Sequence, residues 1–244
     1  DDIQLFGYRT LADVLASMRG LYVSYDRSYH YLGTRGFATP GDYNTRVLLL
    51  VNGVRFNDNV YDQASIGTDF PIDLDLVERV EFVPGPGSAV YGANAFFGVI
   101  NVITRDGRQL GRPQVSTEVG SHGYAKLRFS VGATDAQGGD WLIAATRSTA
   151  RGADQYYPAF DAPASHQGVA HGLDRSTQLF ARMRRDGLTL TLAHGERTKG
   201  IPTAAFSQVF NDPRSRYIDT STRMAAEYAA QWQPTLAFTA RLHA

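Results

Sequence analysis

The sequence predicts a small α+β unit followed by antiparallel β-strands that cross a membrane as part of a barrel. Three observations carry this prediction. A helical pattern and short apolar strands occupy residues 1–105, the hydrophobic period changes to two after Pro113, and short and long connections alternate in the later part of the chain. We therefore divide the chain into a first unit at 1–105, a linker at 106–113 and a strand region at 114–244.

The composition excludes several other classes of protein. The 244 residues include 24 Lys and Arg against 24 Asp and Glu, so no surplus of positive charge is available to neutralise phosphates, and nucleic acid is excluded as a partner. The absence of Cys excludes a disulfide scaffold, a thiolate zinc site and a cysteine nucleophile. No apolar run exceeds the length of Val47–Val51, which is far shorter than the roughly 18 residues of a membrane helix.

An amphipathic helix is expected near the start of the first unit. Apolar residues from Leu11 to Met18 repeat at the spacing of one helical face, Thr10 with Asp13 fits an N-cap, and Gly20 ends the pattern. The chain before it lacks the basic and apolar regions of a secretory signal, which predicts a processed protein or an excised piece.

The rest of the first unit reads as short strands with one further helix. The dipeptide Asn52-Gly53 after a strand at Val47–Val51 predicts a tight hairpin, because both positions tolerate positive φ. A Gly- and Pro-rich bend at 84–92 precedes the last strand. We expect strands at 21–25, 47–51, 54–56, 79–83 and 98–104, and a short helix at 74–78.

Beyond Pro113, apolar and polar residues alternate in about seven segments, many of them near the length of roughly 9 to 11 residues that crosses a bilayer at a tilt. The connections at 135–140, 186–187 and 233–234 are short, whereas those at 153–173 and 198–217 are long. The link at 121–123 is an exception, because it is brief although it falls where a long loop is expected. Outer-membrane barrels sort their connections in this way, with short turns on the periplasmic side. Tyr228 and Trp232 on one face suit an aromatic girdle.

Two readings of this alternation stay open on the sequence alone. The strands belong either to a membrane barrel or to a β-sandwich whose aromatic residues form an ordinary core. The second reading describes a soluble secreted β-rich binding module with a small α+β domain. Extraction distinguishes them, because a membrane barrel fractionates with the outer membrane and needs detergent.

The first 105 residues also resemble a known family, the TonB-dependent outer-membrane receptors, in which an N-terminal plug domain sits inside a β-barrel. Five ordered blocks carry the resemblance: the helix after Thr10, Arg35-Gly-Phe37, Arg46 to Val54, Leu76 to Phe82, and Gly85 to Arg105 with its Gly-Pro-Gly-Ser-Ala-Val-Tyr-Gly and Gly-Val-Ile-Asn-Val-Ile-Thr-Arg segments. Barrels of this family have about 22 strands, so the resemblance implies an incomplete barrel, with further strands after Ala244 and a TonB box before Asp1.

Two positions depart from the family pattern. Asn52 stands where the family usually has Asp, a change that the hairpin tolerates. Pro84 stands where the family has an arginine that helps to lock the plug to glutamates of the barrel. The resemblance therefore implies an ionic plug–barrel contact only for Arg35, which we expect to pair with a carboxylate on a barrel strand.

The resemblance implies a transporter in the outer membrane of a Gram-negative bacterium, with no chemistry of its own and no cofactor. Its expected partners are the TonB-ExbB-ExbD energy-coupling complex, outer-membrane lipid, and a scarce extracellular small molecule such as a siderophore or other iron chelate, haem or cobalamin. The outward-facing plug segments supply the candidate ligand-binding residues, namely Tyr29, Tyr43, Asn59, Tyr61, Asp62 and Gln63. Tyr156 and Tyr157 in a long loop are further candidates.

Other kinds of site find little support. The segment 85–92 lacks the Gly-Lys-Ser/Thr ending of a phosphate-binding loop, and Pro86 removes a backbone N–H that such a loop needs. His166 and His171 lie near Asp161 and Asp174, but the pattern favours solvated loop histidines over a metal site. No catalytic motif is present, so we predict neither an enzyme nor a metal site.

Overall fold

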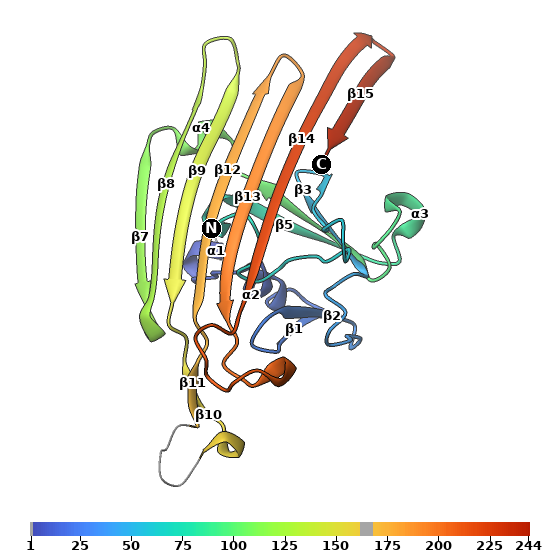
Figure 1. Cartoon of the computed structure of the whole chain (residues 1–244). Coiled ribbons are helices and arrows are strands. Elements are labelled where there is room, and N and C mark those ends of the chain that lie inside the picture. Colours follow the sequence, from blue (N-terminus) through green and yellow to red (C-terminus); the bar gives the residue numbers. More distant parts are fainter. Residues whose placement is uncertain (1, 162–167) are drawn as a thin grey trace.

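The computed structural model describes residues 2–161 and 168–244, and its main feature is a long curved sheet with an α+β unit on one side (Figure 1). Seven antiparallel strands form the sheet in the order β15-β14-β13-β12-β9-β8-β7. Their bounds are β7 Gln114–Gly120, β8 Tyr124–Thr134, β9 Asp140–Ala150, β12 Asp174–Arg185, β13 Leu188–Gly200, β14 Arg216–Gln233 and β15 Leu236–His243. This confirms the expected set of antiparallel strands.

The α+β unit, which we call the N-terminal unit (residues 2–104), contains two small sheets. Strands β1 Leu21–Tyr25 and β2 His30–Thr34 form a hairpin. A four-stranded sheet has the order β4-β3-β6-β5, in which β3 and β6 are parallel. Its strands are β3 Val47–Val51, β4 Val54–Arg55, β5 Val77–Pro84 and β6 Gly98–Thr104, and the helices of the unit are α1 Asp2–Leu5, α2 Leu11–Ala16, the 3₁₀ turn η1 Leu74–Leu76 and α3 Ser88–Tyr91.

Local sequence signals account for several of these elements. Thr10 caps α2 as expected, because its hydroxyl accepts from the Asp13 backbone N–H while the Asp13 carboxylate accepts from the Thr10 backbone N–H. Asn52 and Gly53 take φ values of 50° and 77° in the β3–β4 hairpin. The expected helix at 74–78 is wrong in extent, because only η1 is helical and β5 already begins at Val77. Strand β2 was not expected.

The remaining elements lie outside these sheets. Helix α4 Gly107–Leu110 occupies the predicted linker at 106–113, where its chain is held by the Asp140 carboxylate, which accepts from the backbone N–H groups of Gly107 and Arg108 at 2.9 Å each. The short elements η2 Ser121–Gly123, β10 Asp154–Tyr156, η3 Pro158–Phe160, β11 Val169–His171 and η4 Ala205–Ser207 belong to loops of the long sheet.

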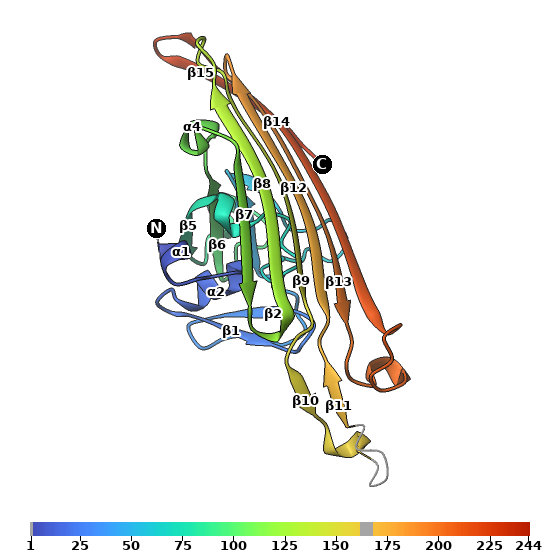
Figure 2. The same ribbon diagram turned by 90° about the vertical axis from the view of Figure 1, so that its left-hand side faces the viewer.

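The two faces of the long sheet differ in chemistry. On the face against the N-terminal unit, Leu142, Phe180 and Ala193 are buried in a shared apolar core. The opposite face carries exposed apolar side chains, including Ile143, Met183, Leu190, Ile218, Met224, Tyr228, Trp232 and Leu242. Figure 2 shows that the N-terminal unit lies wholly on one side of the sheet. The alternation seen in the sequence thus separates a protein-facing side from an apolar exposed side.

The connections of the long sheet are sorted by length with one exception, the three-residue β7–β8 connection η2, which lies at the end that carries the long loops (Figure 1). The short turns β8–β9, β12–β13 and β14–β15 lie together at one end of the sheet, and the β10–β11 hairpin and the long loop with η4 lie at the other (Figure 1). Among the described residues, no helix is long and apolar enough to span a membrane.

Candidate functional site

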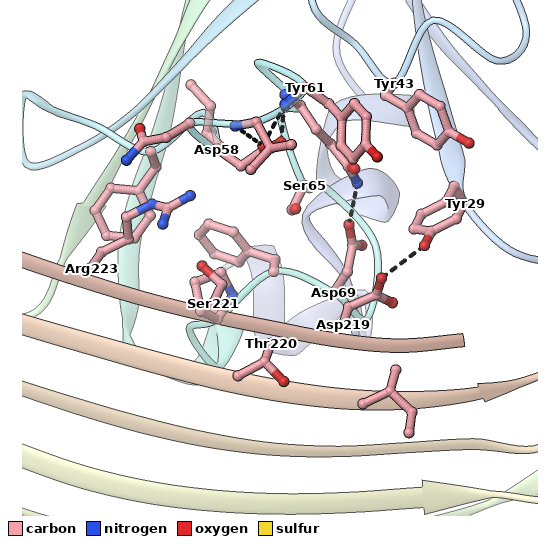
Figure 3. A pocket seen from close by; sticks show the side chains of 18 residues that line it. Tyr29, Tyr43, Asp58, Tyr61, Ser65, Asp69, Asp219, Thr220, Ser221 and Arg223 are labelled. Carbon is pink, nitrogen blue, oxygen red and sulfur yellow. Dashed lines mark hydrogen bonds between the residues drawn. The ribbon is translucent and has the colours of Figure 1, made fainter. Parts of the chain in front are cut away.

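A cavity of about 660 Å³ lies between the N-terminal unit and strand β14 (Figure 3). Plug-like loops of the N-terminal unit form one wall, and side chains of β14 form the other. A volume of this size falls within the range of roughly 300 to 1,000 Å³ typical of small-molecule sites. The lining residues are Tyr29, Tyr43, Leu49, Phe56, Asp58, Asn59, Val60, Tyr61, Gln63, Ser65, Asp69, Phe70, Pro71, Ile218, Asp219, Thr220, Ser221 and Arg223.

The loop after β4 is fixed by two side chains that bond to its own backbone. Asn57 is buried, and its amide donates to the carbonyls of Val47 and Asp62 at 3.0 and 2.8 Å. The Asp58 carboxylate accepts from the backbone N–H groups of Val60, Tyr61 and Gln63, each at 2.7 Å. Because these bonds fix the loop, the exposed ring of Tyr61 is presented to the cavity without a flexible backbone beneath it.

The other end of the cavity is built around Tyr29. Its hydroxyl donates to Asp219 Oδ1 at 2.8 Å, and Asp219 Oδ2 accepts from Arg197 Nε at the same distance. The Arg197 guanidinium also lies 4.7 Å from the centre of the Tyr29 ring, a cation–π contact. Burial and the hydrogen bond to Asp219 raise the pKa of Tyr29, so its phenol stays protonated.

A row of aromatic rings leads from an outer loop into the cavity. Phe206 in η4 lies 6.5 Å from Tyr217 between ring centres, and Tyr217 lies 5.5 Å from Tyr29. The row continues from Tyr29 to Tyr43 at 5.4 Å and from Tyr43 to Tyr61 at 6.5 Å. These separations are those of ordinary aromatic pairs. The row therefore joins the long-loop end of the sheet to the cavity in an unbroken series of contacts.

The structure brings five of the six predicted ligand-binding residues to this cavity: Tyr29, Tyr43, Asn59, Tyr61 and Gln63. Asp62 does not line it, because its side chain forms an ion pair with Arg55. Their role in binding stays a prediction. Sequence reasoning missed further residues of the N-terminal unit, such as Asp58 and Asp69, and the whole contribution of β14. On β14, polar side chains at alternate positions, such as Asp219, Ser221 and Arg223, were a signal of an inward face.

The other candidates from the sequence lie elsewhere. Tyr156 donates a hydrogen bond to Asp161, and the Tyr157 ring packs against Phe210, so neither tyrosine lines the cavity. His171 Nδ1 lies 2.8 Å from Asp154 Oδ1. His166 lies outside the described residues. Within 2–161 and 168–244, no group of three or more potential ligands is arranged to hold a metal ion.

A cluster of charged and polar side chains, which the sequence analysis did not predict, joins the N-terminal unit to β8 and β9. Asp75 Oδ2 lies 2.9 Å from Lys126 Nζ and 2.6 Å from Arg128 Nη1. The Asp73 carboxylate accepts from Thr146 Oγ1 at 2.9 Å and pairs with Lys126 at 3.3 Å. We call these five residues the acid–base cluster. The side chains of Lys126 and Arg128 are only 10% and 7% exposed, so the cluster is largely removed from water.

The charges of the acid–base cluster support one another. Burial alone would raise the pKa of Asp75, but the hydrogen bond from Lys126 and the charges of Lys126 and Arg128 outweigh it, and the pKa lies below the ordinary 3.8. At the edge of the cluster, Arg9 Nε lies 2.8 Å from Glu118 Oε1 on β7. In the acid–base cluster the acids belong to the N-terminal unit and the bases to β8, whereas the Arg9–Glu118 pair has the opposite polarity.

Arg35 behaves differently from these groups. It follows β2, is exposed, and forms no ion pair with any residue among 2–161 and 168–244. Its expected carboxylate partner is not among the described strands, so the contact stays a prediction. We expect Arg35→Ala to increase plug mobility, measured as hydrogen exchange of the segment after β2 in the intact protein. Unchanged exchange and unchanged transport would contradict this contact.

Comparison with known proteins gives one family. Residues 1–99 match the TonB-dependent Receptor Plug Domain. The chain is 34% identical over 178 residues to the vitamin B12 transporter BtuB of Vibrio vulnificus, covering 71% of this chain and 26% of the relative. It is 28% identical over 197 residues to the transporter of the same name from Vibrio cholerae, covering 75% of this chain and 31% of that relative. The chain thus spans about a third or less of these relatives.

Solved structures show the same fold at low identity. FpvA of P. aeruginosa, bound to a heterologous pyoverdine and iron, aligns with a TM-score of 0.67 at 14% identity over 99% of this chain and 32% of its own. The FrpB iron transporter of Neisseria meningitidis aligns with a TM-score of 0.66 at 17% identity over 96% of this chain and 36% of its own. The plug match, the BtuB relatives and the shared fold agree, and the chain belongs to the TonB-dependent receptors, with a plug domain followed by part of the barrel.

Proposed function

We propose that the protein carrying this chain is an outer-membrane receptor of a Gram-negative bacterium that takes up a scarce ligand in an energy-coupled step. In this proposal residues 1–105 are the plug, 106–113 the linker and 114–244 the N-terminal part of the barrel. The plug gates the barrel, and the TonB-ExbB-ExbD complex supplies the energy. The exposed apolar face of the long sheet supports contact with outer-membrane lipid, since lipid imposes no cost on such side chains.

The observation that carries the proposal is the cavity between plug and barrel wall. It places three tyrosine rings, Tyr29, Tyr43 and Tyr61, beside polar and charged side chains, so a small organic ligand could both pack on rings and form hydrogen bonds there. The ring row extends the same surface to Phe206 in the outer loop. We propose Tyr29, Tyr43, Asn59, Tyr61 and Gln63 as ligand-binding residues, with Asp62 acting only by holding Arg55 at the edge of the loop.

The relatives narrow the class of ligand. Two are named as vitamin B12 transporters, and the structural neighbours include receptors for iron chelates. Cobalamin and ferric siderophores are therefore the first ligands to measure. The soluble secreted module loses support, because family membership explains both the plug and the apolar outer face of the strands.

The test of the proposal is uptake by cells that produce the intact protein. We expect the protein to fractionate with the outer membrane, to require detergent for extraction, and to accumulate labelled cyanocobalamin or a labelled ferric siderophore only when the coupling complex is active. Extraction without detergent would contradict the location. Equal accumulation with and without an active coupling complex would contradict the energy-coupled step.

A further inference from the structure

The acidic side chains of the cavity already accept hydrogen bonds from groups of the protein. Asp58 accepts three backbone N–H groups, as described above. Asp69 accepts from the Gly67 backbone N–H and from Gln63 Nε2, both at 3.0 Å. Asp219 accepts from Tyr29 and Arg197. A cationic group on a ligand would have to compete with these donors for the carboxylate oxygens.

Arg223, in contrast, uses few of its hydrogen-bond donors within the protein. It lies on β14 among the lining residues of the cavity (Figure 3), and its side chain is partly buried. Within the described part of the chain, its side chain donates one hydrogen bond, from Nη1 to the backbone carbonyl of its neighbour Thr222 at 3.2 Å, and forms no ion pair. A guanidinium has five N–H donors, so most of the donors of Arg223 remain available to a ligand.

The acids of the cavity already accept hydrogen bonds from the protein, whereas Arg223 has free donors, and this difference favours a ligand with a negatively charged group. A partly desolvated guanidinium gains most from an oxyanion, which it binds through two parallel N–H···O bonds. The cavity also presents the Tyr43 and Tyr61 rings, which favour a flat apolar or aromatic face. The two features lie in one cavity, so one ligand would meet both.

We propose that the cavity selects a ligand that carries an oxyanion, a carboxylate or a phosphate, beside a ring, and that Arg223 is the residue that binds this oxyanion. The proposal rests on the proposed function, because it takes the cavity as the ligand site. It adds a specificity-determining residue and the chemical class that this residue selects.

The experiment measures three ring probes on the intact protein in detergent. Benzoate and phenyl phosphate carry the two oxyanions, and benzamide has the shape of benzoate without the charge. Binding is followed by the change in tyrosine fluorescence. We expect the anions to bind at least about 5-fold more tightly than benzamide, a preference consistent with one charge-assisted contact. The tighter of the two anions identifies the oxyanion that the site prefers.

Variants test whether Arg223 causes the tighter binding of the anions. Arg223→Gln should abolish this preference, Arg223→Lys should keep part of it, and Arg216→Gln should leave it unchanged, because Arg216 lies on the same strand but is exposed and outside the cavity.

Equal binding of all three probes, failure of both anions to bind at any soluble concentration, or a preference that survives Arg223→Gln would overturn the proposal. If energy-coupled uptake persists in those cases, only this inference fails. If uptake is not energy-coupled but the preference is present, the proposed function fails instead.

Discussion

Asp75→Asn is expected to release the plug from the barrel wall far more often than in the native protein. The change leaves Lys126 and Arg128 without their nearest counter-charge at a site where their side chains are 10% and 7% exposed. Removing one partner of a buried ion pair costs about 3 to 5 kcal/mol, because the remaining charge is desolvated and uncompensated. We expect the lower end of that range, since Asp73 still pairs with Lys126 at 3.3 Å.

The measurement is the conductance of the intact protein in a planar bilayer. A loss of about 3 kcal/mol corresponds to an increase on the order of 100-fold in the frequency of large openings. Asp62→Asn is the matched control, because it removes the same charge from an ion pair whose side chains are 57% and 31% exposed, and such surface pairs contribute about 0 to 1 kcal/mol. Equal opening frequencies in the two variants would show that the acid–base cluster does not hold the plug.

The double change Tyr43→Ala with Tyr61→Ala is expected to weaken ligand binding by at least about 100-fold. Each ring contributes exposed aromatic surface to the same cavity, and truncation of a buried aromatic contact commonly costs more than about 1 kcal/mol. The fold should survive, since neither ring belongs to the apolar core.

Equilibrium titration of the intact protein with cyanocobalamin and with ferric siderophores measures this loss for whichever ligand the native protein binds. Tyr91→Ala is the control, because Tyr91 is also a partly exposed plug tyrosine but lies on α3, outside the cavity. Native affinity in the double variant, or an equal loss in the control, would remove this cavity as the ligand site.

Much of the fold follows from local signals in the sequence. The N-cap at Thr10, the hairpin at Asn52-Gly53 and the strand at Gly98–Thr104 depend on residues close together in the chain, so they were predictable. The alternation after Pro113 likewise indicates which side chains share a face. Strand β2 was missed because Thr34 and the residues before it pair with β1 in a hairpin whose sequence lacks a clear period of two.

The site was predictable only on one of its two walls. Loop residues such as Tyr61 carry a signal of their own, because turn-formers surround an aromatic ring that no core needs. The partners on the barrel side, Asp219 and Arg223, are about 160 residues away from Tyr61 along the chain, and only the three-dimensional packing of plug against sheet brings them to the same cavity. The acid–base cluster was missed for the same reason, since Asp75 and Lys126 carry no mutual signal in the sequence.

The most direct test of the central proposal combines transport with the cavity. Uptake of the bound ligand is measured in cells that produce either the native protein or the Tyr43→Ala, Tyr61→Ala variant, each with and without an active coupling complex. We predict accumulation only for the native protein and only with coupling, at equal amounts of protein in the outer membrane. Accumulation by the variant at the native rate, or by the native protein without coupling, would contradict a plugged receptor that binds its ligand between plug and barrel wall.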